Sequence, residues 1–279
     1  MNANLMQMAL QLSVQDMFSS SWFSNALMNK VWAEMMRSSV TGLIRNTGGG
    51  DLLGAALGGR LRGDAAMLRQ ASSNVAEAQS MMSTAADAAG NIANQLKEAD
   101  KLAGEYLALG PDDDPARAAL QAQYEAISNN IDSIIKNTMY NGIALLDGSA
   151  WKNDGRLAVI GNAANPTAAS VHIQAGDSGF PLTFSNMIPE FFNIAGSHKL
   201  DDDVRTALSN LQSSVQSLAD LYAGRAGSLQ SQASSLQSQA NILDEAAAQR
   251  AKTPEPVRPE NVLLNLILRD SGSLFSSKG

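Results

Sequence analysis

Apolar and small residues recur at every third or fourth position from Leu68 to Ala103, which is the spacing of one face of an α-helix. The repeat continues for about five heptads, as in a helix that packs along other helices. Alanine occupies many of these positions, so neighbouring helices can approach closely. We therefore expect a long helix over residues 66–108. Its seam includes Leu68, Val75, Met82, Ile92 and Leu96.

A second helix is expected over residues 115–139. The acidic run Asp112-Asp113-Asp114 before Pro115 supplies an N-cap followed by proline at the first helical position. The segment ends at Asn141-Gly142, a dipeptide that favours a turn with positive φ. The apolar seam of this helix contains Ile127, Ile131 and Ile134.

A third long helix is expected over residues 203–250, after the acidic run Asp201-Asp202-Asp203. Pro254 and Pro256 end the helical pattern, because proline removes a helical donor and clashes with the preceding turn. The heptad positions of all three helices predict a long antiparallel helical bundle or coiled coil. The seam of the third helix contains Leu208, Val215, Leu229, Leu236 and Leu243.

Between residues 143 and 200 the period of the pattern changes from that of a helix to that of a strand. Apolar residues stand two apart in short runs, which are separated by Gly, Asn and Pro. The pairs are Leu157 with Val159, Val171 with Ile173, and Leu182 with Phe184. This segment predicts a small antiparallel β-hairpin region, so the fold class is mainly α.

The two ends of the chain carry apolar residues at helical spacing, and we expect them to form assembly segments over residues 1–45 and 254–279. A glycine-rich stretch over residues 46–62 predicts a flexible joint before a core domain over residues 63–253. Apolar surface left in water costs free energy, so the ends should bury against each other or against copies of themselves. The candidate assembly residues are Leu5, Met8, Leu12, Trp22, Phe23, Leu27, Val31, Trp32, Met35, Val262, Leu263, Leu266 and Ile267.

The charge balance disfavours two classes of partner. The chain has 20 Lys and Arg against 27 Asp and Glu, a net charge of −7, which is the wrong sign for nucleic-acid binding. The amino-terminal segment has too few basic residues to favour an anionic membrane surface.

The amino-terminal segment also lacks the basic start, apolar core and cleavage site of a Sec signal peptide, so secretion would need another route.

Candidate chemistry is sparse. The chain has no Cys and only two His, and it carries no zinc-protease, P-loop or nucleophile-elbow motif. The triple-Asp runs lack the spacing and glycine of a calcium loop, so helix capping explains them better. We therefore expect no catalytic residue, cofactor or metal site. His172, which stands between Val171 and Ile173, is expected to face solvent.

The segment Ile131–Leu146 resembles the signature I-x-x-I-x-x-x-T-x-F/Y-N-G-x-x-L-L of bacterial flagellins. Leu68–Asn74 and Val171–Gly176 add weaker similarity, and the resemblance covers roughly residues 60 to 250. Two features depart from the family: only fragments of its conserved segment precede the first long helix, and three prolines interrupt the carboxy-terminal region. The signature positions are Thr138, Tyr140, Asn141, Gly142, Leu145 and Leu146.

The resemblance implies an extracellular, non-enzymatic subunit of a flagellar filament that functions in motility. The subunit would form a helical homopolymer through its terminal segments after type III secretion, with an export chaperone and filament cap or hook-junction proteins as further partners. Two alternatives stay open. One is a hook–filament junction protein or minor flagellin-like adaptor, and the other is a secreted binding or membrane-active protein built on a flagellin core.

Overall fold

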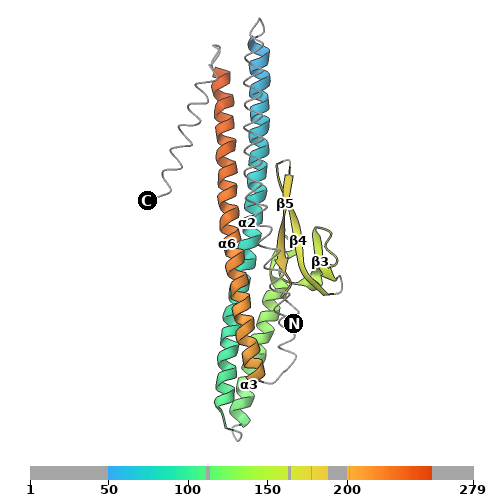
Figure 1. The fold of residues 1–279 in the computed structure, drawn as a ribbon, viewed down its shortest axis with the longest axis vertical. Coiled ribbons are helices and arrows are strands. Elements are labelled where there is room, and N and C mark those ends of the chain that lie inside the picture. Colours follow the sequence, from blue (N-terminus) through green and yellow to red (C-terminus); the bar gives the residue numbers. More distant parts are fainter. Residues whose placement is uncertain are drawn as a thin grey trace, which may run out of the picture. The chain divides into compact units, whose positions relative to one another are not determined.

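A computed structural model describes residues 50–110, 114–162, 165–176, 178–187, 200 and 202–252. The expected assembly segments over residues 1–45 and 254–279, with all their candidate residues, lie outside this part of the chain. The described part is mainly helical with two small antiparallel sheets, which confirms the predicted fold class (Figure 1). No helix in it is long and apolar enough to cross a membrane.

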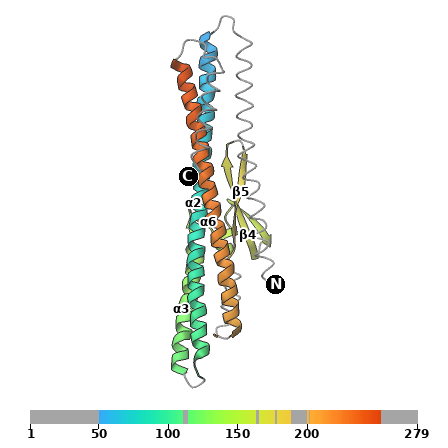
Figure 2. The same ribbon diagram turned by 60° about the vertical axis from the view of Figure 1, so that its left-hand side comes forward.

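Three long helices form the body: α2 (Gly50–Ala108), α3 (Asp114–Asn137) and α6 (Asp202–Lys252). The chain divides into two compact units, one that includes residues 74–231 and another that includes residues 50–73 and 232–252. Helices α2 and α6 contribute residues to both units. Within the larger unit, α3 and α6 lie alongside α2 in both views (Figures 1 and 2).

Helix α2 begins at Gly50, whereas the sequence predicted a flexible joint over residues 46–62 and a helix from residue 66. Residues 50–62 are therefore helical despite their glycines. Leucine and alanine between these glycines favour a helix, and Leu61 packs on the cluster that α2 forms with α6 in the smaller unit. Packing of this apolar side chain offsets the cost that glycine adds to a helix.

In the smaller unit, α2 and α6 pack through a cluster of Ala65 and Leu68 with Ala240 and Leu243. Leu236 packs against this cluster and is half-buried. The buried Ser72 Oγ donates a hydrogen bond of 2.8 Å to the carbonyl of Ala233. A small polar residue thus remains compatible with close helix packing, because its hydroxyl finds an acceptor on the neighbouring helix.

In the larger unit, the seams of the three helices form one apolar interior. The expected seam residues of α2 and α6 that belong to this unit lie in it, whereas Ile127 and Ile134 of α3 are half-buried and Ile135 is fully buried. A straight helix drifts away from a strict seven-residue line, and this drift brings Ile135 next to Ile131 on the buried face. The fully or nearly buried seam residues are Val75, Met82, Ile92, Leu96, Ile131, Leu208, Val215 and Leu229.

Three strands form an antiparallel sheet in the order β3 (Leu157–Asn162), β4 (Asn165–Ala175) and β5 (Ser178–Ser185). Their register aligns one residue from each predicted apolar pair, since Leu157 lies opposite Val171 and Val171 opposite Leu182. The expectation of a small β region is therefore met. His172 in β4 is exposed, as its alternation with apolar neighbours predicts.

Helix α6 holds the edge of this sheet through Tyr222. The Tyr222 ring centroid lies 6.1 Å from that of Phe184, and its hydroxyl accepts a hydrogen bond of 2.8 Å from the Ser185 amide. Burial raises the pKa of Tyr222 above its ordinary value. Arg225, one turn later, donates from Nη2 to the carbonyl of Pro181 at 3.4 Å. These contacts occupy backbone groups of β5 that would otherwise face outward as an open strand edge.

We expect Leu96→Ala to lower the free energy of unfolding by about 2–5 kcal/mol, because Leu96 is fully buried and alanine would leave a cavity. The neighbouring Lys97→Ala is the control, since Lys97 is exposed on the same helix. Urea unfolding followed by far-UV circular dichroism measures both values. Equal stability of the two variants would contradict the packing described above.

Candidate functional site

The signature positions lie where α3 ends and the chain turns toward the sheet. Thr138 follows the last helical residue, and both its amide and its hydroxyl donate to the carbonyl of Ile134, at 3.0 and 2.6 Å. Its own carbonyl accepts from the amide of Leu145 at 3.0 Å. Thr138 therefore closes the helix and at the same time anchors the strand that returns past it.

A two-residue hairpin occupies the middle of the signature. Strand β1 (Met139–Tyr140) pairs with β2 (Ile143–Ala144), with Tyr140 opposite Ile143. Between them, Asn141 has φ +47° and Gly142 has φ +75°. Positive φ at both central residues defines a type I′ turn, which is the reason that Asn-Gly is favoured here.

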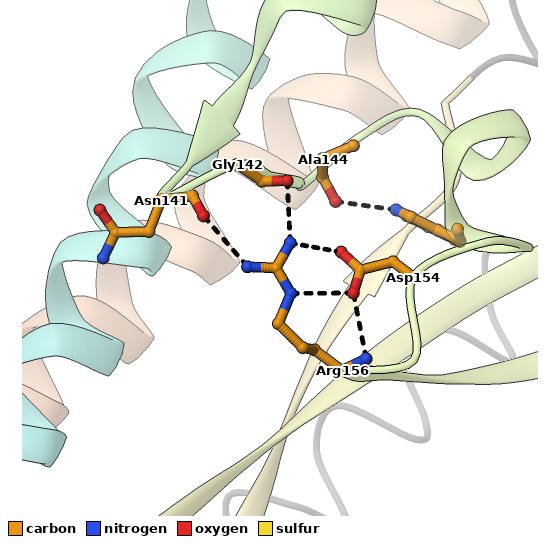
Figure 3. A network of polar contacts seen from close by, with 6 residues as sticks. Asn141, Gly142, Ala144, Asp154 and Arg156 are labelled. Carbon is orange, nitrogen blue, oxygen red and sulfur yellow. Dashed lines mark hydrogen bonds and ion pairs between the residues drawn. The ribbon is translucent and has the colours of Figure 1, made fainter.

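Arg156 binds the backbone carbonyls of this turn (Figure 3). Its Nη1 donates to the carbonyl of Asn141 at 3.1 Å, and its Nη2 donates to the carbonyl of Gly142 at 3.0 Å. The same guanidinium grips the carboxylate of Asp154, with Nε to Oδ1 at 2.8 Å and Nη2 to Oδ2 at 2.7 Å. The planar fork of arginine allows one side chain to bind both backbone carbonyls and a carboxylate.

The hydrogen bonds between Asp154 and Arg156 also affect their protonation. Donation from the guanidinium and from the Arg156 amide holds the pKa of Asp154 below its ordinary value. The pKa of Arg156 is raised by the same hydrogen bond. Both groups are therefore charged at neutral pH. Because Arg156 is half exposed to water, the pair contributes mainly orientation, and its Coulomb energy is screened.

The turn is tied to α2 through Asn141, whose side-chain amide donates to Glu77 Oε1 at 2.9 Å. Figure 3 shows the Asn141 side chain directed toward α2, away from Arg156. On α3, Lys136 pairs with Asp132 at 2.8 Å, and this hydrogen bond raises the pKa of Lys136. Two side chains therefore hold the turn: the carboxylate of Glu77 on α2 and the guanidinium of Arg156 just before β3.

After the hairpin, the chain passes into a buried corner. Leu145 and Leu146 are fully buried, and Asp147 caps the short helix α4 (Gly148–Trp151) by accepting from the amide and hydroxyl of Ser149. Trp151 is almost fully buried and donates from Nε1 to the carbonyl of Ala144 at 2.8 Å. The indole therefore fills the corner while satisfying a carbonyl of β2.

Asn186, just after β5, connects this corner to the three-stranded sheet. Its Oδ1 accepts from the amide of Gly148 at 3.0 Å, and its Nδ2 donates to the carbonyl of Pro166 at 2.8 Å. A Cβ atom on Gly148 would overlap the Asn186 side chain. Glycine at position 148 therefore leaves room for the Asn186 side chain and its two hydrogen bonds.

Of the predicted signature residues, Thr138, Leu145 and Leu146 are buried, Tyr140 is half-buried, and Asn141 and Gly142 are exposed at the turn. The structure brings all six into one motif. Sequence reasoning missed Arg156, Trp151 and Asn186, which hold this motif in place. The only local signal was Trp151, which follows the Asp147-Gly148 pair after two residues. The roles of Arg156 and Asn186 depend on long-range contacts.

The arrangement has the contacts of a structural joint. Arg156 pairs with Asp154 and with backbone carbonyls, and the carboxylates of Glu77 and Asp147 accept hydrogen bonds from Asn141 and Ser149. Among the described residues, no group of three or more His, Cys, Asp or Glu could hold a metal ion. The site therefore orients the end of α3, the hairpin and the sheet relative to one another within the larger unit.

Comparison with known proteins gives two matches. Residues 2–150 match the family described as the bacterial flagellin N-terminal helical region. The chain is also 27% identical over 181 residues to a flagellin from Clostridium tyrobutyricum, a match that covers 63% of this chain and 48% of the relative. The chain thus spans about half the length of this curated relative.

We expect Gly148→Ala to lower the free energy of unfolding by about 1–3 kcal/mol, because the new methyl group must displace the Asn186 side chain from its two hydrogen bonds. Gly155→Ala is the matched control, since a Cβ there meets no atom within 4 Å. Urea unfolding of both variants decides the matter. A Gly148 variant as stable as the Gly155 variant would show that the corner tolerates the extra atom.

Proposed function

The chain belongs to the bacterial flagellin family, and on that premise we propose that it is a structural subunit of an extracellular flagellar filament. The family consists of structural proteins, so membership supports a structural role and offers no support for catalysis. The observation that carries the proposal is the match over residues 2–150, which includes the signature turn and the whole of α2.

We propose that copies of the chain join through the apolar terminal segments, residues 1–45 and 254–279. The support comes from the sequence, where apolar residues at helical spacing flank a body whose own seams are already filled by α2, α3 and α6. A contact between two different surfaces of neighbouring copies continues without limit when the rotation between them does not close. Such a contact yields a helical homopolymer.

Export and partner proteins follow from the same proposal. The subunit would leave the cell by type III secretion, with an export chaperone covering the carboxy-terminal apolar segment before release. Outside the cell, filament cap and hook-junction proteins would contact the two ends of the polymer. The long helices would carry the mechanical load of the filament, because their buried seams would resist bending and twisting.

Negative-stain electron microscopy of the full-length protein over a concentration series tests the proposal. We expect long fibres of constant diameter from the unchanged protein and from Asn91→Asp, which adds one charge at an exposed position of α2. Leu27→Asp adds the same charge to the amino-terminal apolar segment and should abolish the fibres. Circular dichroism of all three proteins checks that the helical body is retained.

Two results would contradict the proposal. Monomers or small closed rings at every concentration would favour the role of a junction protein or minor adaptor over that of a filament subunit. Fibres of normal length from Leu27→Asp would separate polymerisation from the amino-terminal segment and overturn the proposed route of assembly.

A further inference from the structure

Asn141-Gly142 is the one Asn-Gly dipeptide in the sequence, and both residues are exposed at the tip of the hairpin. Glycine after asparagine leaves the backbone nitrogen open to ring closure, because no side chain hinders its approach. We propose that Asn141 is a site of spontaneous deamidation, and that Arg156 and Glu77 slow this reaction in the folded protein. The inference concerns the chemical lifetime of the turn and does not depend on polymerisation.

The reaction needs solvent water and no other reagent. The deprotonated backbone nitrogen of Gly142 attacks Cγ of Asn141, a new C–N bond forms, and the bond from Cγ to Nδ2 breaks with release of ammonia. Water then opens the resulting five-membered succinimide at either carbonyl. The product is aspartate or isoaspartate, and in isoaspartate the backbone runs through the side-chain methylene of residue 141.

Arg156 opposes the first step. The carbonyl of Asn141 and the amide nitrogen of Gly142 belong to the same planar peptide group. To reach Cγ, that nitrogen must rotate about the backbone, and the carbonyl must rotate with it. Arg156 Nη1 binds this carbonyl at 3.1 Å, and Nη2 binds the next carbonyl at 3.0 Å. Ring closure in the native state therefore requires loss of at least one charge-assisted hydrogen bond.

Glu77 opposes the same step from the other side. Its carboxylate accepts a hydrogen bond from Nδ2 of Asn141 at 2.9 Å, and this contact directs the carboxamide toward α2. Cγ must turn away from α2 to meet the nitrogen of Gly142. Glu77 thus holds the carboxamide that carries the electrophilic Cγ, and Arg156 holds the peptide group that contains the nucleophilic nitrogen. Figure 3 shows the contacts of Arg156.

Neither reaction product would fit the contacts that hold Asn141 in the native turn. Aspartate places a carboxylate oxygen where Nδ2 donated to Glu77, so an attraction becomes a repulsion between like charges. Isoaspartate also lengthens the backbone of a two-residue turn whose carbonyls match the spacing of one guanidinium. Once formed, the product should loosen the pairing of β1 with β2 and stay in the loosened state.

Full-length protein is incubated at mildly alkaline pH, and peptide mapping by mass spectrometry follows conversion at Asn141. We expect Arg156→Lys to convert about tenfold faster than the unchanged protein in the native state, which corresponds to loss of about 1.4 kcal/mol from the barrier. Glu77→Ala should also convert faster. Arg69→Lys is the matched control, since Arg69 pairs with Asp244 on an exposed surface of the other unit.

The same four proteins are then incubated in concentrated urea, where the native contacts are absent and all four rates should be equal and high. Native rates of Arg156→Lys and Glu77→Ala equal to that of the unchanged protein would overturn the proposal. So would an unchanged protein that converts as fast when folded as in urea. If circular dichroism shows that Arg156→Lys does not fold, Glu77→Ala decides alone, because its substitution lies at an exposed position of α2 and leaves the turn backbone intact.

Discussion

Close packing between α2 and α6 is the interaction on which the rest of the structure depends. Alanine and serine along α2 let the neighbouring backbone approach, and leucines fill the space between the small residues. Ser72 illustrates the constraint, because a polar atom is tolerated there when its hydrogen bond to Ala233 is made across the interface. In the larger unit, these helices supply the surface on which α3 and the smaller elements are ordered.

The signature turn is the point where helical packing gives way to the sheet. Thr138 closes α3, the Asn-Gly turn reverses the chain, and the buried Leu145 and Leu146 carry it into the corner filled by Trp151. Polar contacts from Arg156 and Glu77 hold the exposed tip, while apolar burial holds its base. The motif is held at both ends, which suits a joint that keeps helices and strands in one arrangement.

The base and the tip of the motif are protected in different ways. The base is protected by burial and responds to changes of volume, as the contact of Gly148 with Asn186 requires. The tip faces water and is held by hydrogen bonds, so its chemistry depends on whether the Arg156 guanidinium and the Glu77 carboxylate stay in place. In the proposed extracellular filament, the lifetime of such a tip would limit the lifetime of the joint.

Three long helices, the strands and the turn at Asn141-Gly142 could be predicted from the sequence, apart from the amino-terminal extension of α2. Each of these depends on side-chain periodicity or backbone preference among residues close in the chain. Tertiary structure alone decided that residues 50–62 are helical, that Ile135 replaces Ile134 on the buried face, and that Arg156, Trp151 and Asn186 support the signature turn. Asn186 meets Gly148 across 38 residues and Glu77 meets Asn141 across 64, so no local pattern encodes these partners. They become neighbours only after helix packing and strand register have placed distant segments side by side.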